Sequence, residues 1–170
     1  MQVLRANGLS DCLVWSALER AMAVEPSIMG SRATADNLER VYRDRHALLL
    51  WDDGRAVGFI AAWNTPTGNL EIGATWVDSA YRGQGLGNLL AREIVMLIGE
   101  IRGARGFAIT TNPRFVAAAL RAGMRLHGDW RDPIAWEATC GPCDAIAENE
   151  KAACPKRNAA CRLLFCPDSD

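Results

Sequence analysis

The chain has 170 residues, of which 49% are hydrophobic, so it is long and apolar enough for one domain with a substantial core. Its 19 lysines and arginines nearly balance its 20 aspartates and glutamates, which argues against a dedicated binder of nucleic acid or of membrane surfaces. No apolar run approaches the length of about 20 residues that a transmembrane helix needs, and the N-terminus lacks the layout of a signal peptide. We therefore expect a cytoplasmic protein.

The first half of the chain predicts a strand, two helices and a three-stranded meander. Ser10 and Asp11 precede apolar residues at helical spacing, which indicates the start of a helix. Thr34 is a suitable N-cap for the second helix. Asp53-Gly54 lies between two apolar runs and is a strong hairpin signal. The expected strands are residues 3–5, 47–51, 56–63 and 70–78.

The second half predicts helices and strands in alternation. Leucines and isoleucines recur at three- and four-residue steps from Leu86 to Ile101, which is one face of a helix of about four turns. A second helix over 113–123 has Pro113 in its first turn and Gly123 at its end. Strands over 105–110, 124–130 and 134–140 complete the order β-α-α-β-β-β-α-β-α-β-β, an α+β arrangement with a mixed sheet.

Three glycines at alternate positions, 83, 85 and 87, lie where the last strand of the meander gives way to the helix that begins at Leu86. Without Cβ atoms they let a ligand approach the backbone, and the first N–H groups of a helix attract anions because they lack internal partners. The loop therefore predicts a phosphate or pyrophosphate site, and the alternative is a turn and helix start that need no ligand. It does not fit the dinucleotide fingerprint, and Asn88-Leu89 stands where a P-loop has Lys-Ser/Thr.

The stretch Arg82–Gly87, with the sequence RGQGLG, resembles the R/Q-x-x-G-x-G/A signature of the GNAT superfamily of N-acyltransferases. The predicted element order is also the one that this family uses, and the resemblance covers roughly residues 1–140. It implies a GNAT acyl-CoA N-acyltransferase fold, with a central, mostly antiparallel sheet flanked by helices.

The resemblance also implies acetyl- or acyl-coenzyme A as the donor and an amine as the acceptor. In such a protein the strand before the motif pairs with the pantetheine arm, the loop holds the pyrophosphate, and the next strand splays away to admit the cofactor. Asn112 matches an asparagine that the family often places beside the pantetheine. The residues expected at the cofactor are Trp76, Val77, Arg82, Gly83, Gln84, Gly85, Leu86, Gly87, Asn88 and Asn112.

Glu71 is the expected general base. It lies eleven residues before Arg82, a spacing that resembles the histone-acetyltransferase branch of the family. A carboxylate in a partly apolar cleft can take a proton from an attacking amine. Strand alternation predicts that Glu71, Gly73, Thr75 and Val77 share one face. The alternative interpretation is a solvated glutamate at the start of a strand.

One catalytic residue of the family is missing. Members often carry a tyrosine seven residues after the asparagine, where it protonates the leaving thiolate, but this chain has Ala119 there. A thiol of pKa about 8.5 can leave without full protonation, so an active acetyl- or acyl-CoA-dependent N-acyltransferase is the leading hypothesis. A catalytically silent GNAT fold used as a structural or interaction module is the second. A nucleic-acid-modifying acyltransferase is the third, and the net charge of -1 disfavours it.

Cysteines are concentrated at the C-terminal end, which suggests a GNAT domain over residues 1–140 and a Cys-rich extension over residues 141–170. Four thiolates would close a tetrahedral zinc site, while free thiols and disulfides are the alternatives. The extension would add an acceptor surface, a homodimer contact or a site for a protein partner. The best four metal ligands are Cys140, Cys143, Cys154 and Cys161, with Cys166 as a rival.

Overall fold

The computed structural model describes residues 1–5, 12–25, 32–101, 103, 105–128 and 160–167. The described elements follow the predicted order of strands and helices, apart from one short 3-10 turn after the fourth strand. They are β1 (Gln2–Arg5), α1 (Cys12–Ala23), α2 (Ala35–Arg43), β2 (Ala47–Asp52), β3 (Arg55–Asn64), β4 (Leu70–Val77), η1 (Ser79–Tyr81), α3 (Leu86–Gly99), β5 (Gly106–Thr110), α4 (Pro113–Arg121), β6 (Arg125–His127) and β7 (Arg162–Phe165).

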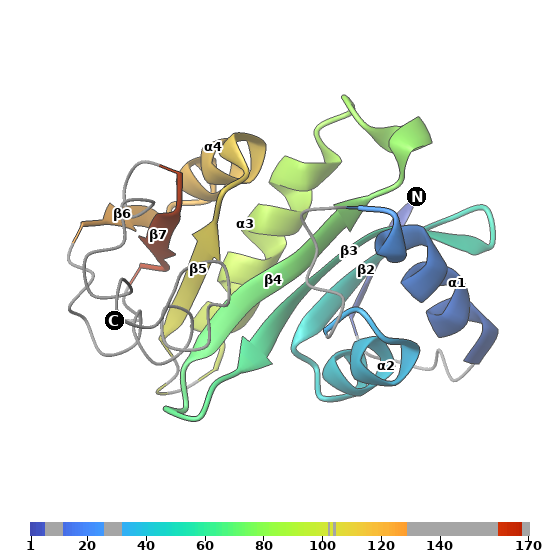
Figure 1. Cartoon of the computed structure of the whole chain (residues 1–170), viewed down its shortest axis with the longest axis horizontal. Coiled ribbons are helices and arrows are strands. Elements are labelled where there is room, and N and C mark those ends of the chain that lie inside the picture. Colours follow the sequence, from blue (N-terminus) through green and yellow to red (C-terminus); the bar gives the residue numbers. More distant parts are fainter. Residues whose placement is uncertain (6–11, 26–31, 102, 104, 129–159, 168–170) are drawn as a thin grey trace.

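The strands form one seven-stranded sheet in the order β1-β2-β3-β4-β5-β7-β6 (Figure 1). Neighbouring strands are antiparallel except β4 and β5, which run parallel. The predicted mixed, mostly antiparallel sheet is therefore confirmed. Its parallel pair follows from the chain path, because α3 carries the chain back across the sheet between β4 and β5.

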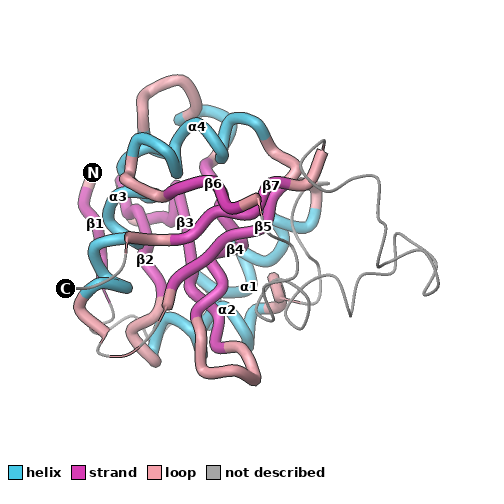
Figure 2. The backbone as a smooth tube through the Cα atoms, turned by 90° about the vertical axis from the view of Figure 1, so that its left-hand side faces the viewer, coloured by secondary structure: helices cyan, strands magenta, loops and turns pink. Residues whose placement is uncertain are grey.

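Helices cover both faces of the sheet (Figures 1 and 2). On one face α1 and α2 bury Trp15, Leu38 and Tyr42 against β2 and β3. On the other face α3 buries Leu90 and Ile94 against the central strands, and α4 lies beside it. Within the described residues, no helix is long and apolar enough to span a bilayer.

Local sequence signals place several of the elements. The Thr34 side chain accepts a hydrogen bond from the Asn37 amide, so it caps α2 as predicted. Asp53 and Gly54 both have positive φ angles, of 44° and 75°, which is the geometry of a tight hairpin turn between β2 and β3. The expected start of the first helix at Ser10 and Asp11 lies outside the described residues.

The last strand of the sheet comes from a segment that the sequence did not predict. The expected strand over 134–140 lies outside the described residues, whereas β7 pairs with both β5 and β6. Leu163 and Leu164 on β7 are fully buried. Residues 162–165 therefore belong to the main sheet, and the predicted boundary at residue 140 does not hold for them. The strand has only four residues, one of them Arg162, which is too short a stretch for its periodicity to identify it as a strand.

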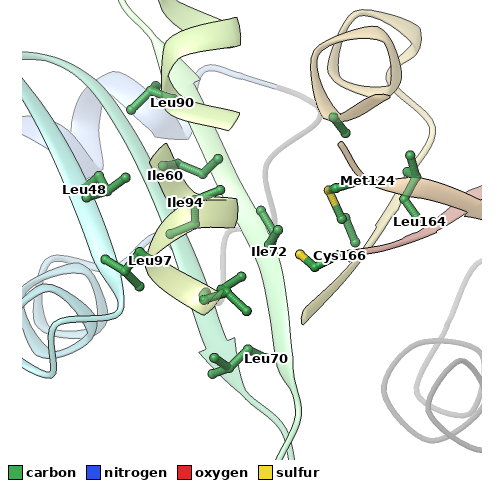
Figure 3. Close-up of a cluster of buried hydrophobic side chains, with 14 of the residues drawn as sticks. Leu48, Ile60, Leu70, Ile72, Leu90, Ile94, Leu97, Met124, Leu164 and Cys166 are labelled. Atoms are coloured by element: carbon green, nitrogen blue, oxygen red, sulfur yellow. The ribbon is translucent and has the colours of Figure 1, made fainter. Parts of the chain in front are cut away.

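Cys166 follows β7 and packs inside the core (Figure 3). A Cβ atom added at Gly106 would meet its sulfur at 2.6 Å, so strand β5 needs a glycine at this contact. Burial raises the pKa of the Cys166 thiol to about 12. A cysteine binds metal as a thiolate, which this environment disfavours. Cys166 therefore has the surroundings of a core residue, and these do not support it as the alternative zinc ligand.

The zinc prediction falls mostly on residues whose positions are not described. Cys140, Cys143 and Cys154 lie outside the described residues. Among the side chains that are described, which include Cys161, no group of three or more His, Cys, Asp or Glu could hold a metal ion.

Candidate active site

Strands β4 and β5 begin side by side and then separate. Their parallel pairing is confined to Leu70 with Gly106 and Glu71 with Phe107. Beyond Glu71, the edge of β4 that faces β5 is therefore left without strand partners. A row of unpaired backbone groups on such an edge is a template for another extended chain. This separation is the splay that the family resemblance implies.

A β-bulge in β4 lies at the point of separation. Ala74 and Thr75 together oppose the single residue Ile60 on β3, and Ala74 has a φ angle of 52°. The extra residue reverses the alternation of side chains beyond it. Trp76 consequently packs on the α1 and α2 side of the sheet, and Val77 packs on the α3 side.

The bulge corrects one prediction from the sequence. Simple alternation placed Glu71 and Val77 on the same face. In the structure Glu71 contacts Arg32, which lies shortly before α2, whereas Val77 packs against the core under α3. The prediction was wrong because it assumed that side chains alternate strictly between the two faces along the whole strand. The extra residue of the bulge breaks that alternation.

A cleft of about 480 Å³ opens where the two strands part. Its walls come from the end of β4, the loop before α3, the first turns of α3 and α4, and Glu25, which follows α1. The described residues that line it are Glu25, Thr75, Trp76, Val77, Arg82, Gly83, Gly87, Asn112, Pro113, Arg114, Phe115 and Ala118. A smaller cavity of about 90 Å³ continues between β4 and β5 and shares Thr75, Asn112 and Phe115 with the cleft.

The glycine loop, residues Arg82–Gly87, closes one end of the cleft. Gly83 and Gly85 have φ angles of 81° and 80°, which favour glycine. Gly87 has an ordinary backbone conformation, but a Cβ atom there would enter open space beside the cleft. The first amides of α3 carry the positive end of the helix dipole. The loop thus has the conformation and the open approach that an anionic group such as pyrophosphate requires.

Arg82 is held against the cleft wall by two acceptors. Its Nε donates to the carbonyl oxygen of Val77 at 3.0 Å, and its Nη2 forms an ion pair with Glu25. Both Arg82 and Glu25 line the cleft. A bound phosphate would therefore meet a guanidinium that is already oriented, with one carboxylate competing for it.

Asn112 lies at the cleft but has a structural role as well. Its Oδ1 accepts from the amides of Arg114 at 3.0 Å and Phe115 at 3.4 Å, which caps α4. Asn88, in the first turn of α3, accepts a hydrogen bond from Arg121 of α4 at 3.3 Å. Arg114 and Arg121 therefore add positive charge near the cleft that the sequence reasoning missed.

Glu71 lies at the inner end of this arrangement, just before the strands separate. Its side chain is buried, and its Oε2 accepts from Nη2 of Arg32 at 2.6 Å. The alternative interpretation of a solvated glutamate is wrong, because the carboxylate lies between the sheet and Arg32. Glu71 does not line the main cleft, but its neighbours Ile72 and Gly73 line the smaller cavity that extends it.

The sequence profile of the acetyltransferase (GNAT) family matches residues 13–123 of the chain. The chain belongs to this family. A search of curated protein sequences found no match. Members of the family transfer an acyl group from acyl-coenzyme A to an amine, which is the activity that the sequence motif implied.

Solved structures share the GNAT fold at low sequence identity. Rv2747 from Mycobacterium tuberculosis, solved with CoA, is 16% identical with a TM-score of 0.65, and the match covers 97% of this chain and 98% of that one. Ribosomal-protein-alanine N-acetyltransferase from Brucella melitensis is 17% identical with a TM-score of 0.60, covering 97% of each chain. N-acetylglutamate synthase from Neisseria gonorrhoeae is 19% identical with a TM-score of 0.59, covering 96% of this chain but only 34% of that enzyme.

Most residues predicted for the GNAT cofactor site come together around the cleft. Six of them line it directly: Trp76, Val77, Arg82, Gly83, Gly87 and Asn112. Gln84, Gly85 and Asn88 belong to the same loop and first helical turn. The Leu86 side chain points into the core and is 5% exposed, so only its backbone can face a ligand. Sequence reasoning missed Glu25, which is distant in the chain, and Arg114-Phe115, which follow the predicted helix start.

No tyrosine lines the described part of the cleft. Tyr81 donates to Asp52 at 3.0 Å, and Tyr42 is buried beneath the sheet against Trp15. Ala119, at the position where the family often has a tyrosine, is fully buried in the core, while its neighbour Ala118 faces the cleft. A larger side chain at residue 119 would have to displace core residues.

Proposed function

We propose that this GNAT protein transfers the acetyl group of acetyl-coenzyme A to an amine, with the donor bound in the cleft between β4 and β5. The separation of the two strands next to the glycine loop carries the proposal. It supplies an unpaired strand edge for an extended, amide-containing arm and an anion site at the end of that edge.

The donor is positioned by groups that the chain holds in place before binding. The pyrophosphate would lie against the amides of the glycine loop and the first turn of α3, with Arg82 beside it. The pantetheine amides would pair with the free edge of β4 near Trp76 and Val77. The open space at Gly87 supports this placement, because a Cβ atom at that residue would project toward the phosphates.

Glu71 would act as the general base. Its Oε2 is engaged by Arg32, so Oε1 is the atom that takes the proton from the attacking amine, directly or through one water. The amine nitrogen then forms a bond to the thioester carbonyl carbon, and the carbon–sulfur bond breaks. Coenzyme A leaves as a thiolate, which solvent protonates, because no tyrosine lines the described part of the cleft.

The acceptor class is narrower than amines in general. The names of two of the solved relatives refer to N-acetylation of an amino acid, namely N-acetylglutamate synthase and ribosomal-protein-alanine N-acetyltransferase. We propose an α-amine as the acceptor here as well. The buried carboxylate of Glu71 supports this, because it can pair with an ammonium group before deprotonation.

Three further expectations stay predictions. They are the cytoplasmic location, the zinc site, and a homodimer contact or protein partner bound through residues 141–170. Elemental analysis of the reduced protein tests the zinc site, since a site formed by Cys140, Cys143, Cys154 and Cys161 would hold about one metal ion per chain.

Acetyl-coenzyme A binding and turnover test the proposal together. We expect acetyl-coenzyme A to raise the unfolding temperature of the protein in a concentration-dependent way, because it binds only the folded state. We also expect free coenzyme A to be released when α-amines are added. Binding without turnover of any amine would favour the silent module, and the absence of binding would refute the proposal.

A further inference from the structure

Glu71 and Arg32 form an ion pair in which the carboxylate is buried and the guanidinium side chain is partly exposed. Within the described residues, Glu71 is the only charged side chain that is buried, and it is 7% exposed. The Arg32 side chain is 27% exposed and uses Nη2 for the contact with Glu71. Buried ion pairs contribute little net stability, because desolvation of both charges offsets their attraction. Nη1 of Arg32 is not used in the contact with Glu71, so it can donate to a ligand.

Trp63 supplies a second polar group at the same place. It lies opposite Glu71 on β3, is 8% exposed, and has the Arg32 guanidinium 5.9 Å from its ring centroid. Its indole Nε1 is buried, and none of the described residues accepts a hydrogen bond from it. Indole nitrogen is a donor only, and leaving a buried donor unpaired is costly. Because no described residue accepts from this N–H, an oxygen atom of a ligand could pair with it.

Gly73 leaves space in front of both donors. A Cβ atom at this residue would lie 3.5 Å from Nη1 of Arg32 and 3.5 Å from Nε1 of Trp63. The backbone of Gly73 does not have a positive φ, so its conformation does not require glycine. The absence of a side chain here leaves a space of about one methyl group, and an oxygen atom in that space would lie close to both nitrogens.

This position adjoins the cleft. Gly73 and Thr75 line the small cavity between β4 and β5, and Thr75 also lines the main cleft. Under the proposed function, the acetyl group would lie at this inner end of the cleft. Gly73 therefore lies between this cavity and the side chains of Arg32 and Trp63.

We propose that Arg32, Trp63 and Glu71 form the acceptor subsite of this transferase, and that the acceptor is a free α-amino acid. The inference rests on the proposed function. One carboxylate oxygen of the amino acid accepts from Nη1 of Arg32 and Nε1 of Trp63, and its ammonium group pairs with Oε1 of Glu71. The ion pair is neutral overall, and so is a zwitterion, so binding leaves no uncompensated charge in the subsite.

Charge favours a carboxylate over the carbonyl of a peptide. The N-terminal residue of a peptide presents an ammonium group next to a neutral carbonyl oxygen, which would bring one positive charge to a neutral pair. A carboxylate on the guanidinium forms a charge-assisted hydrogen bond, about twice as strong as a neutral one. A free amino acid therefore satisfies all three side chains, whereas a peptide N-terminus satisfies them less well.

Coenzyme A release tests the substrate class. The protein is supplied with acetyl-coenzyme A and each of the twenty L-amino acids, and the best substrate is compared with its α-amide, its decarboxylated amine and a peptide that begins with it. We expect kcat/KM for the amino acid to exceed that of each comparison compound by about 100-fold, the scale of a lost charged contact. Equal use of the amide, preference for the peptide, or no turnover of any amino acid would overturn the proposal.

Variants separate the subsite from the donor site. Trp63→Phe keeps an aromatic ring but removes the unpaired N–H together with part of the indole volume, so we expect KM for the amino acid to rise about 10-fold and the unfolding temperature to fall slightly. Gly73→Ala fills the space between the donors and should raise KM at least as much. Arg32→Lys should raise KM while Arg40→Lys, a control on the exposed face of α2, does not.

Acetyl-coenzyme A affinity in these variants distinguishes a failure of the acceptor subsite from a failure of the proposed function. We expect its Kd, measured by calorimetry, to stay within about twofold of wild type in Trp63→Phe and Gly73→Ala. Unchanged donor binding with unchanged KM for the amino acid would refute the acceptor subsite alone. Absence of donor binding in the wild-type protein would refute the proposed function.

Discussion

The glycine loop and the acceptor subsite lie beside the same strand, β4, but they are built differently. The glycine loop is one continuous stretch, Arg82–Gly87, and works mainly through backbone N–H groups and open space. The acceptor subsite consists of the side chains of Arg32, Trp63 and Glu71, which come from three separate parts of the chain. One site depends on local conformation, and the other depends on the tertiary fold.

This difference matches what each site has to recognise. A pyrophosphate is the same in every acyl-coenzyme A, so backbone amides at a helix start can bind it without side-chain specificity. An acceptor differs from one enzyme to the next, and side chains can change without altering the backbone. The two sites should therefore respond separately to substitution, with donor binding affected at one and acceptor use at the other.

Glu71→Gln is expected to have the largest effect on the acceptor side. The amide cannot take a proton from the amine, so we expect turnover to fall by about 100-fold or more, with the largest loss at acid to neutral pH, where the amine is mostly protonated. Acetyl-coenzyme A affinity should not change. Stopped-flow or steady-state kinetics across a range of pH measure the turnover rate. Wild-type rates in Glu71→Gln would remove Glu71 from the mechanism.

Arg82→Gln is expected to have a smaller effect, confined to the donor side. The variant loses one charged contact to the pyrophosphate, so the Kd for acetyl-coenzyme A should rise about 10-fold, and the difference from wild type should shrink at high salt. KM for the acceptor should be unchanged. If acceptor KM rises and donor Kd does not, the two sites are not separate in the way described here.

Glu25→Gln should act in the opposite direction. Glu25 pairs with Arg82 in the cleft, so a pyrophosphate must displace its carboxylate. Removing that negative charge should lower the Kd for acetyl-coenzyme A by about two- to fivefold. Calorimetry on Glu25→Gln measures the change, and weaker binding would mean that Glu25 orients Arg82 for the donor instead of competing with it.

How far the sequence predicted these features depends on whether a feature is local. The hairpin at Asp53-Gly54, the cap at Thr34 and the glycine loop all follow from short-range chemistry, and the sequence identified each of them. The bulge at Ala74 and the strand β7 could not be identified, because one is an extra residue in a regular pattern and the other is only four residues long.

The acceptor subsite was only partly foreseen for the same reason. Glu71 was expected from its spacing to the glycine loop. Its contact with Arg32, 39 residues away, and the unpaired Nε1 of Trp63 depend on the packing of α2 against the sheet. Nothing in the local sequence around Arg32 or Trp63 distinguishes them from ordinary surface and core residues.

Cys166 is also buried, but unlike Glu71 and Trp63 it belongs to neither proposed binding site. Its raised pKa, about 12 against an ordinary 9.0, means that the protonated thiol stabilises the fold. This contribution is fully present below pH 9.0 and is lost as the pH rises toward 12. Cys166→Ala should cost about 1 kcal/mol near pH 7 and less at pH 10 in urea unfolding, with no effect on donor or acceptor affinity. An equal cost at both pH values would contradict this account of Cys166.

Binding of acetyl-coenzyme A to two helix glycine variants tests the central claim most directly. Gly87 and Gly99 both lie in α3, and a Cβ atom at either meets nothing within 4 Å, but only Gly87 lines the cleft. Valine is a better helix former than glycine, so both variants should fold. By calorimetry we expect Gly87→Val to weaken acetyl-coenzyme A binding by at least about 100-fold and Gly99→Val to leave it within about twofold. Equal affinities in the two variants would contradict the placement of the donor in this cleft.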